Sequence, residues 1–188
     1  MSFYRRRLPH WQPEGAPIFL TWRLHGSLPR SKIAGPVTEG QRFVLLDRQL
    51  DSASCGPTFL KNAQVAEAVI KTFFIAANKW DLYELFAWVV MSNHVHLLVQ
   101  PHKSLSEVTR AVKKASARQA NLILGRSGLP FWQDESYDHW VRNGKQFDRI
   151  VQYIESNPVK AGLVDHADNW PWSSAFAGTV GQVPDLPS

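Results

Sequence analysis

Residues 86–101, FAWVVMSNHVHLLVQP, constrain the fold of this chain more than any other stretch. Two apolar runs, at 82–91 and 94–100, are separated only by Ser92 and Asn93, which predicts adjacent antiparallel strands joined by a tight turn. Runs that are apolar on both faces are typical of strands in the middle of a sheet. The chain is therefore expected to build its core around a β-sheet.

The flanking segments add a strand and several helices. Residues 17–26 mix β-branched and aromatic residues and predict a strand, whereas residues 131–142 predict irregular structure or an edge strand. Helical spacing of apolar residues predicts helices near 38–52, 62–79, 104–124 and 145–158. This order predicts an α+β sandwich, with helices packed on a small antiparallel sheet.

Three helix ends carry recognisable signals. Asn62 is expected to be an N-cap, and the spacing of Ser104 and Glu107 predicts a capping box. Pro158 is expected to end the last long helix because proline cannot continue the hydrogen-bond ladder.

Composition limits the functional class. The 188 residues include 21 Lys and Arg against 16 Asp and Glu, and the net charge of +5 favours a polyanionic partner such as nucleic acid. Cys55 is the only cysteine, and no run reaches the roughly 18 apolar residues of a membrane span. The arginines near the N-terminus are not followed by the apolar segment of a secretory signal. A cytoplasmic protein without a membrane partner is expected.

Two histidines one residue apart are the first candidate site. Alternation along a strand places His94 and His96 on one face and Val95 on the other. Paired imidazoles suit a divalent cation, although two half-exposed histidines on an edge strand would show the same pattern. Two ligands are too few, so a metal site requires a third.

The helix predicted at 145–158 offers that third ligand. At about 100° per residue, Tyr153 and Asn157 lie on one flank of its apolar stripe and Glu155 lies on the other. An amide oxygen is a competent ligand for Mg²⁺ or Mn²⁺, and a phenol beside such an ion can act as a nucleophile. A buried ring at residue 153 and a helix terminator at residue 157 are the structural alternatives.

With these residues in view, the chain resembles the HUH single-tyrosine transposases, and most closely the REP-associated tyrosine transposases of bacteria. SNHVHLLV matches the histidine–hydrophobic–histidine element, and YIESNPVKAGLV (153–164) matches the catalytic helix. Further matching blocks occur in the family's order at residues 4–24, 131–142 and 168–175. Ser92 stands where a proline is common in this motif, and residues 27–57 align least well.

The resemblance implies a transposase domain over residues 1–176 with a ferredoxin-like sheet, a basic arm at 1–16 and a flexible tail at 177–188. It implies that Tyr153 is the nucleophile and that His94, His96 and Asn157 bind Mg²⁺ or Mn²⁺, with Glu155 left open as a competing ligand. A monomer is expected more than a dimer, in the bacterial cytoplasm and on the nucleoid when DNA is bound.

The implied substrate is single-stranded DNA that carries REP-type hairpins. The enzyme would cut it through a 5′-phosphotyrosine intermediate and join strands by reversal. Arginine and lysine side chains would bind the phosphates. They are Arg5, Arg6 and Arg7 in the arm, and Arg110, Lys113, Lys114 and Arg118 in the helix at 104–124. Trp11, Trp132 and Trp140 are candidates for base stacking, with core packing as the alternative for each.

Three other functions compete with this one, the weakest being charge-steered RNA binding, which a comparison of DNA with RNA hairpins would test. A domesticated relative would bind hairpin DNA, or regulate, without cutting it. A metal-dependent hydrolase would use the histidine pair to activate water; the absence of Asp or Glu on the metal-facing flank of the last helix speaks against it. A covalent protein–DNA adduct distinguishes the transposase from the non-cutting relative and from the hydrolase.

Overall fold

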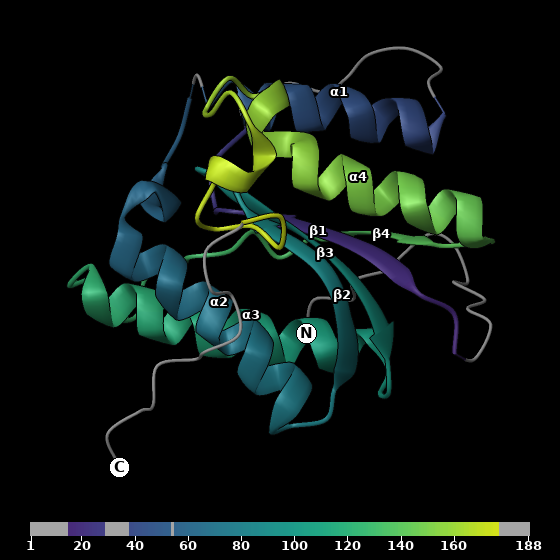
Figure 1. The fold of residues 1–188 in the computed structure, drawn as a ribbon. Coiled ribbons are helices and arrows are strands. Elements are labelled where there is room, and N and C mark those ends of the chain that lie inside the picture. Colours follow the sequence, from purple (N-terminus) through teal and green to yellow (C-terminus); the bar gives the residue numbers. More distant parts are fainter. Residues whose placement is uncertain (1–14, 29–37, 54, 177–188) are drawn as a thin grey trace.

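The computed structural model describes residues 15–28, 38–53 and 55–176 (Figure 1). Its sheet has four antiparallel strands in the order β2-β3-β1-β4. Their bounds are β1 Ile18–Arg23, β2 Tyr83–Val90, β3 His94–Pro101 and β4 Tyr137–Trp140. The longer helices are α1 Glu39–Asp51, α2 Ala63–Asn78, α3 Leu105–Ile123 and α4 Gly144–Lys160, with short 3₁₀ turns η1 Phe59–Lys61 and η2 Ala167–Asn169.

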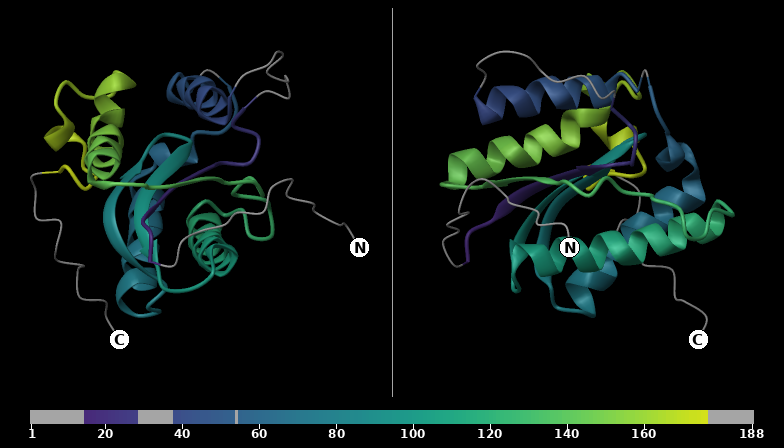
Figure 2. Two further views of the ribbon diagram at one scale, coloured as in Figure 1. Left: turned by 90° about the vertical axis from the view of Figure 1, so that its right-hand side faces the viewer. Right: turned by 180° about the vertical axis from the view of Figure 1, so that it is seen from behind.

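The strand order and connections are those of the ferredoxin-like fold, which confirms the predicted fold class. Helices α2 and α3 cover one face of the sheet, and α1 and α4 cover the other (Figure 2). Strand β3 is central as predicted, but β2 is an edge strand of the sheet rather than an interior one. Residues 131–142 supply the opposite edge strand, β4.

Each face of the sheet has its own apolar core. The core under α2 and α3 is the larger, and Val95, Leu97 and Val99 of β3 belong to it. The core under α4 contains Phe19, Leu98 and Ile154, with Phe43 of α1 packed against it. Because side chains alternate along β3, its histidines face this second core.

The predicted helix ends were right at one position and wrong at two. Asn62 caps α2 by accepting hydrogen bonds from the backbone N–H groups of Gln64 and Val65. The predicted capping box at Ser104 was wrong, since its hydroxyl donates to the Glu107 carboxylate at 3.4 Å instead of capping the backbone. Helix α4 also continues through Pro158 to Lys160, because a proline in the last turn removes a single N–H donor.

The outer edge of β2 is covered by the chain that follows η2. The backbone N–H of Val90 donates to the Trp172 carbonyl at 2.8 Å, and that of Ser174 donates to the Trp88 carbonyl at 2.9 Å. Residues 172–174 therefore pair with residues 88–90, at the end of β2. Within the described ranges, no helix is long and apolar enough to cross a membrane.

Candidate active site

The two histidines of β3 are completely buried and their rings lie side by side. Both side chains have 0% exposure, and the Nε2 atoms of His94 and His96 are 3.1 Å apart. Two cation ligands with bonds of about 2.1 Å are about 3.0 Å apart when they occupy adjacent octahedral positions. The spacing of the two nitrogens is that of a ligand pair.

The other nitrogen of each ring is held by a neighbour on the sheet. His96 lies opposite Thr21 of β1, and its Nδ1 is 2.7 Å from the threonine hydroxyl. The Nδ1 of His94 is 2.8 Å from the Asn93 side-chain oxygen, which can only accept. His94 therefore carries its proton on Nδ1 and presents a lone pair at Nε2, as a metal ligand requires.

Helix α4 brings Tyr153 and Asn157 to the same place, one turn apart. The amide nitrogen of Asn157 is 3.3 Å from His96 Nε2, and its amide oxygen is buried without a partner. A half-turn of the amide exchanges these two atoms, so Asn157 can present an oxygen to the histidines. The Tyr153 ring packs edge-on against His96, with centroids 5.7 Å apart.

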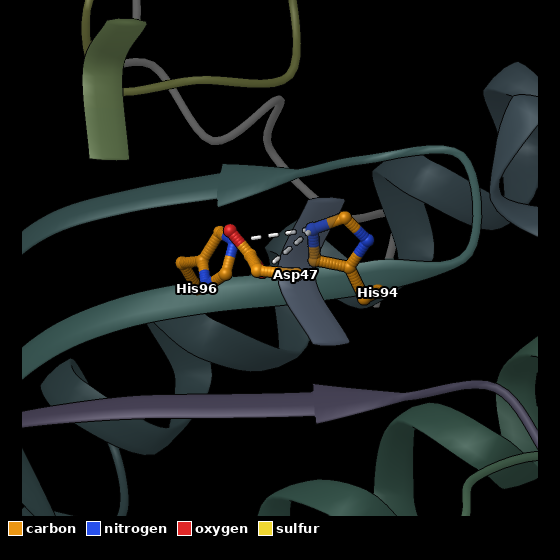
Figure 3. Close-up of side chains that lie close together, drawn as sticks. All are labelled: Asp47, His94 and His96. Atoms are coloured by element: carbon orange, nitrogen blue, oxygen red, sulfur yellow. Dashed lines mark hydrogen bonds and ion pairs between the residues drawn. The ribbon is translucent and has the colours of Figure 1, made fainter. Parts of the chain in front are cut away.

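Helix α1 contributes two carboxylates that sequence reasoning did not anticipate. Asp47 lies between the two imidazoles (Figure 3), with its Oδ1 3.3 Å from His96 Nε2 and 3.7 Å from His94 Nε2. Its Oδ2 accepts a hydrogen bond from the Tyr153 hydroxyl. Asp51, one turn later, places an oxygen 3.7 Å from His94 Nε2. The argument against a hydrolase considered carboxylates on the last helix alone, so it missed these two on α1.

These groups change one another's pKa values. Burial, and then the neighbouring His96 imidazole, lower the pKa of His94 to about 3, so its ring is neutral. Burial raises the pKa of Asp47, but the His96 and His94 imidazoles and the Tyr153 hydroxyl outweigh it and hold that pKa well below its usual range. Burial and the Asp47 charge raise the pKa of Asp51 to about 7. Burial and the same carboxylate raise the pKa of Tyr153 far above its usual value, so the phenol is protonated.

The residues present fit a hard divalent cation. Three buried oxygens, one each from Asp47, Asp51 and Asn157, have no hydrogen-bond partner. Those of Asp47 and Asp51 lie within 3.7 Å of an imidazole nitrogen, and the Asn157 oxygen would face His96 after a half-turn of its amide. Buried polar atoms without partners are uncommon in folded proteins, and a bound ion accounts for such a group. A mixed set of imidazole, carboxylate and amide oxygen donors suits Mg²⁺ or Mn²⁺.

Glu155 lies away from this cluster. Its carboxylate accepts a hydrogen bond from the Ser174 hydroxyl at 3.2 Å, which ties α4 to the segment that covers the β2 edge. For Glu155 to bind the cation instead, α4 would have to roll and that hydrogen bond would have to break.

The described basic residues that were predicted to bind phosphate lie on α3, away from the tyrosine. Arg110, Lys114 and Arg118 are exposed on α3, on the opposite face of the sheet. Lys113 is half-buried, and its Nζ donates to the carbonyls of Gln133 and Asp134 at 2.6 and 2.9 Å. The side chains of Arg110, Lys113 and Lys114 border a shallow hollow with Trp132. Arg5, Arg6, Arg7 and Trp11 lie outside the described residues.

Two of the three tryptophans predicted to stack on bases are described, and their surroundings differ. Trp132 belongs to the core, where its ring is 6% exposed and its Nε1 donates to the Ser116 hydroxyl. Trp140 is half-buried on β4 and lies beneath the Arg142 guanidinium.

The sequence did contain a signal for the missed carboxylates. Phe43, Leu46 and Leu50 form the inward stripe of α1 at helical spacing, and Asp47 interrupts it. A carboxylate on an apolar stripe needs a buried partner, and here the partners are His94 and His96. Asn93 was predicted only as a turn residue, whereas its buried side chain orients His94.

Comparison with known proteins identifies the relatives of this chain. A sequence model of the family described as "Transposase IS200 like" matches residues 58–157. The REP-associated tyrosine transposase of Escherichia coli K12 is 33% identical over 95 residues, covering 49% of this chain and 54% of the relative. The putative REP-associated tyrosine transposase of Haemophilus influenzae is 30% identical over 106 residues, covering 49% and 58%. The chain thus spans little more than half the length of these curated relatives.

A solved structure shares the fold over most of the chain. The structure of the REP-associated tyrosine transposase bound to a REP hairpin is 26% identical, with a TM-score of 0.55, and the match covers 92% of this chain and 82% of that one. Together these matches confirm the resemblance expected from the histidine and tyrosine motifs.

Proposed function

The chain belongs to the IS200-like transposase family, and from this premise we propose that it cuts and rejoins single-stranded DNA that carries REP-type hairpins. The names of its relatives and of the hairpin-bound structure support that substrate. The observation that carries the proposal is the convergence of one phenol, Tyr153, with two buried imidazoles from a strand far away in the sequence.

The cation site of the proposal consists of His94, His96 and Asn157. These residues would hold Mg²⁺ or Mn²⁺, which would supply Lewis acidity to the scissile phosphate. Thr21 and Asn93 hold the outer nitrogens of the two rings, so that both Nε2 atoms point into the site. The neutral state of His94 leaves its lone pair available to the ion.

Tyr153 is the nucleophile of the proposal. Its oxygen forms a bond to phosphorus while the bond from phosphorus to the 3′ oxygen breaks. The phenol loses its proton and the departing 3′ oxygen gains one, leaving a 5′-phosphotyrosine and a free 3′-hydroxyl. The phosphoester energy is kept in this linkage, so the 3′-hydroxyl of another strand can reverse the step without a nucleotide cofactor. The Phe19 and Phe43 rings pack around Tyr153 and limit its rotation.

The basic face of α3 and the N-terminal arm bind the DNA backbone in this proposal. Arg110, Lys114 and Arg118 project from the opposite side of the sheet, so they would bind a part of the hairpin distant from the cleaved bond. Lys113 would bind phosphate on the same surface while its Nζ also donates hydrogen bonds to the carbonyls of residues 133 and 134.

A covalent-adduct assay tests the proposal. The full chain is incubated with Mn²⁺ and an end-labelled oligonucleotide that carries a REP hairpin and flanking single strand, and the products are run on a denaturing gel. We expect a labelled band at the combined mass of protein and DNA. Tyr153→Phe is expected to bind the hairpin with unchanged affinity and to form no adduct.

The other outcomes distinguish the rival functions. Binding without cleavage would identify a hairpin-binding protein. Cleavage without an adduct would identify a hydrolase, for which Asp47 and Asp51 supply the carboxylates near the histidines. An adduct that persists in Tyr153→Phe would assign the nucleophile to another residue.

A further inference from the structure

Helix α1 ends before residue 58, where the family match begins, yet it reaches the centre of the site. Local hydrogen bonds fix the start of this helix, because Thr38 and Gln41 form a reciprocal capping box there. Its outer face is exposed, and Asp47 and Leu50 are its two buried residues within the described side chains. A carboxylate is thus carried inward by an otherwise superficial helix.

Asp47 is placed to act as a further ligand beside the two histidines. Its Oδ1 and the two imidazole Nε2 atoms form a triangle with sides of 3.1, 3.3 and 3.7 Å. Three ligands at about 2.1 Å from one ion are about 3.0–3.4 Å apart in octahedral or tetrahedral arrangements. Two sides of the triangle lie in or close to that range, and the third needs a shift of a few tenths of an ångström.

A buried carboxylate needs partners that stabilise its negative charge. Asp47 is 3% exposed, and its Oδ1 has no hydrogen-bond partner. Within the described part of the chain, its ion-pair partners are imidazoles rather than lysine or arginine. A cation bound between Asp47 and the histidines would place a full positive charge beside this oxygen.

We propose that Asp47 is a ligand of the divalent cation and a positioning residue for the nucleophile. Its Oδ1 joins His94 and His96 at the ion, while its Oδ2 holds the Tyr153 hydroxyl. One carboxylate then fixes the distance between the cation and the attacking oxygen. The role of Asp47 as a positioning residue rests on the proposed function. Its role as a cation ligand does not, since cation binding requires neither DNA nor turnover.

The first half is tested by calorimetric titration of the full chain with Mn²⁺ in the absence of DNA. Asp47→Asn keeps the shape of the side chain and removes its charge; we expect Mn²⁺ affinity to fall by about tenfold or more. Asp148→Asn, which removes one exposed carboxylate from α4, is the matched control and is expected to bind as the wild type does. Thermal melting without metal verifies that each variant is folded. An affinity of folded Asp47→Asn within about twofold of wild type would overturn the ligand assignment.

The second half is tested by adduct formation at saturating Mn²⁺. Asparagine retains an oxygen that accepts from Tyr153, whereas alanine does not. We expect Asp47→Asn to form adduct about tenfold faster than Asp47→Ala once both are saturated with metal. If Asp47→Ala is as fast as the wild type, or faster, Asp47 obstructs the phosphate and the positioning role is wrong. Loss of Mn²⁺ affinity in Asp47→Asn together with no adduct from the wild type would refute the transposase function and leave the ligand assignment standing.

Discussion

The side chain of Asn93 donates to the backbone carbonyl of Leu50 at 3.0 Å, which joins the start of β3 to the end of α1. The oxygen of the same side chain accepts from His94. One buried amide therefore orients a cation ligand and fixes the helix that carries Asp47.

Replacing Asn93 is expected to affect stability and metal binding together. Asn93→Ala leaves the Leu50 carbonyl and the His94 Nδ1 without their partner, which costs about 1–3 kcal/mol for a buried group. Removing an outer partner of a ligating histidine also weakens metal binding by about 10–100-fold. Denaturant titration and Mn²⁺ calorimetry measure the two effects. Asn143→Ala, which removes the N-cap of α4, is the control for stability, and its Mn²⁺ affinity is expected to be unchanged.

Glu155 is expected to contribute to stability and not to the cation. Glu155→Gln weakens the bond to Ser174 but leaves the imidazoles untouched, so Mn²⁺ affinity and the rate of adduct formation should match the wild type. The stability cost of removing one partly exposed hydrogen bond is about 1 kcal/mol or less. A tenfold reduction in Mn²⁺ affinity would contradict this and return Glu155 to the ligand set.

Neutralising the exposed basic residues of α3 is expected to weaken hairpin binding in a salt-dependent way. For the triple variant Arg110→Gln, Lys114→Gln and Arg118→Gln, the slope of log affinity against log salt should become shallower by about 0.7–0.9 for each phosphate that the protein no longer neutralises. Fluorescence anisotropy at several salt concentrations measures the slope. Lys79→Gln, an equivalent change at the exposed end of α2, is the single-residue control. An unchanged slope in the triple variant would place the DNA elsewhere.

Trp132 is expected to act through the core rather than by stacking on a base. Trp132→Ala removes a 6% exposed indole and its bond to Ser116, and such truncations cost about 3–5 kcal/mol. Trp132→Phe should recover much of that stability and bind the hairpin as the wild type does. Folded Trp132→Phe that binds the hairpin more than tenfold more weakly would assign the indole to the DNA instead.

The parts of the site that lie within single elements were predictable from the sequence. Alternation along β3 places His94 and His96 on one face, and the helical period of α4 places Tyr153 with Asn157 and separates both from Glu155. Each of these relationships is set by backbone geometry over a few residues. The structure agrees with all of them.

Relationships between distant elements were not predictable in the same way. Asp47 meets His96 across a separation of 49 residues, and helical periodicity shows which face of α1 is inward but not which part of the sheet it covers. The predicted end of α4 was wrong for a local reason. Whether a helix can continue past a proline such as Pro158 depends on how the carbonyls of its final turn are satisfied. The Asn157 and Pro158 carbonyls accept from Ala161 and Leu163 and complete that turn.

The pairing of residues 172–174 with β2 limits how two molecules could associate through the edges of their sheets. An open strand edge is a template onto which another chain can add, and the bonds from Val90 to Trp172 and from Ser174 to Trp88 use that template within one molecule. A second copy that adds a strand at the end of β2 would first have to displace this segment. Among the described strands, the opposite edge of the sheet is β4, which has only four residues.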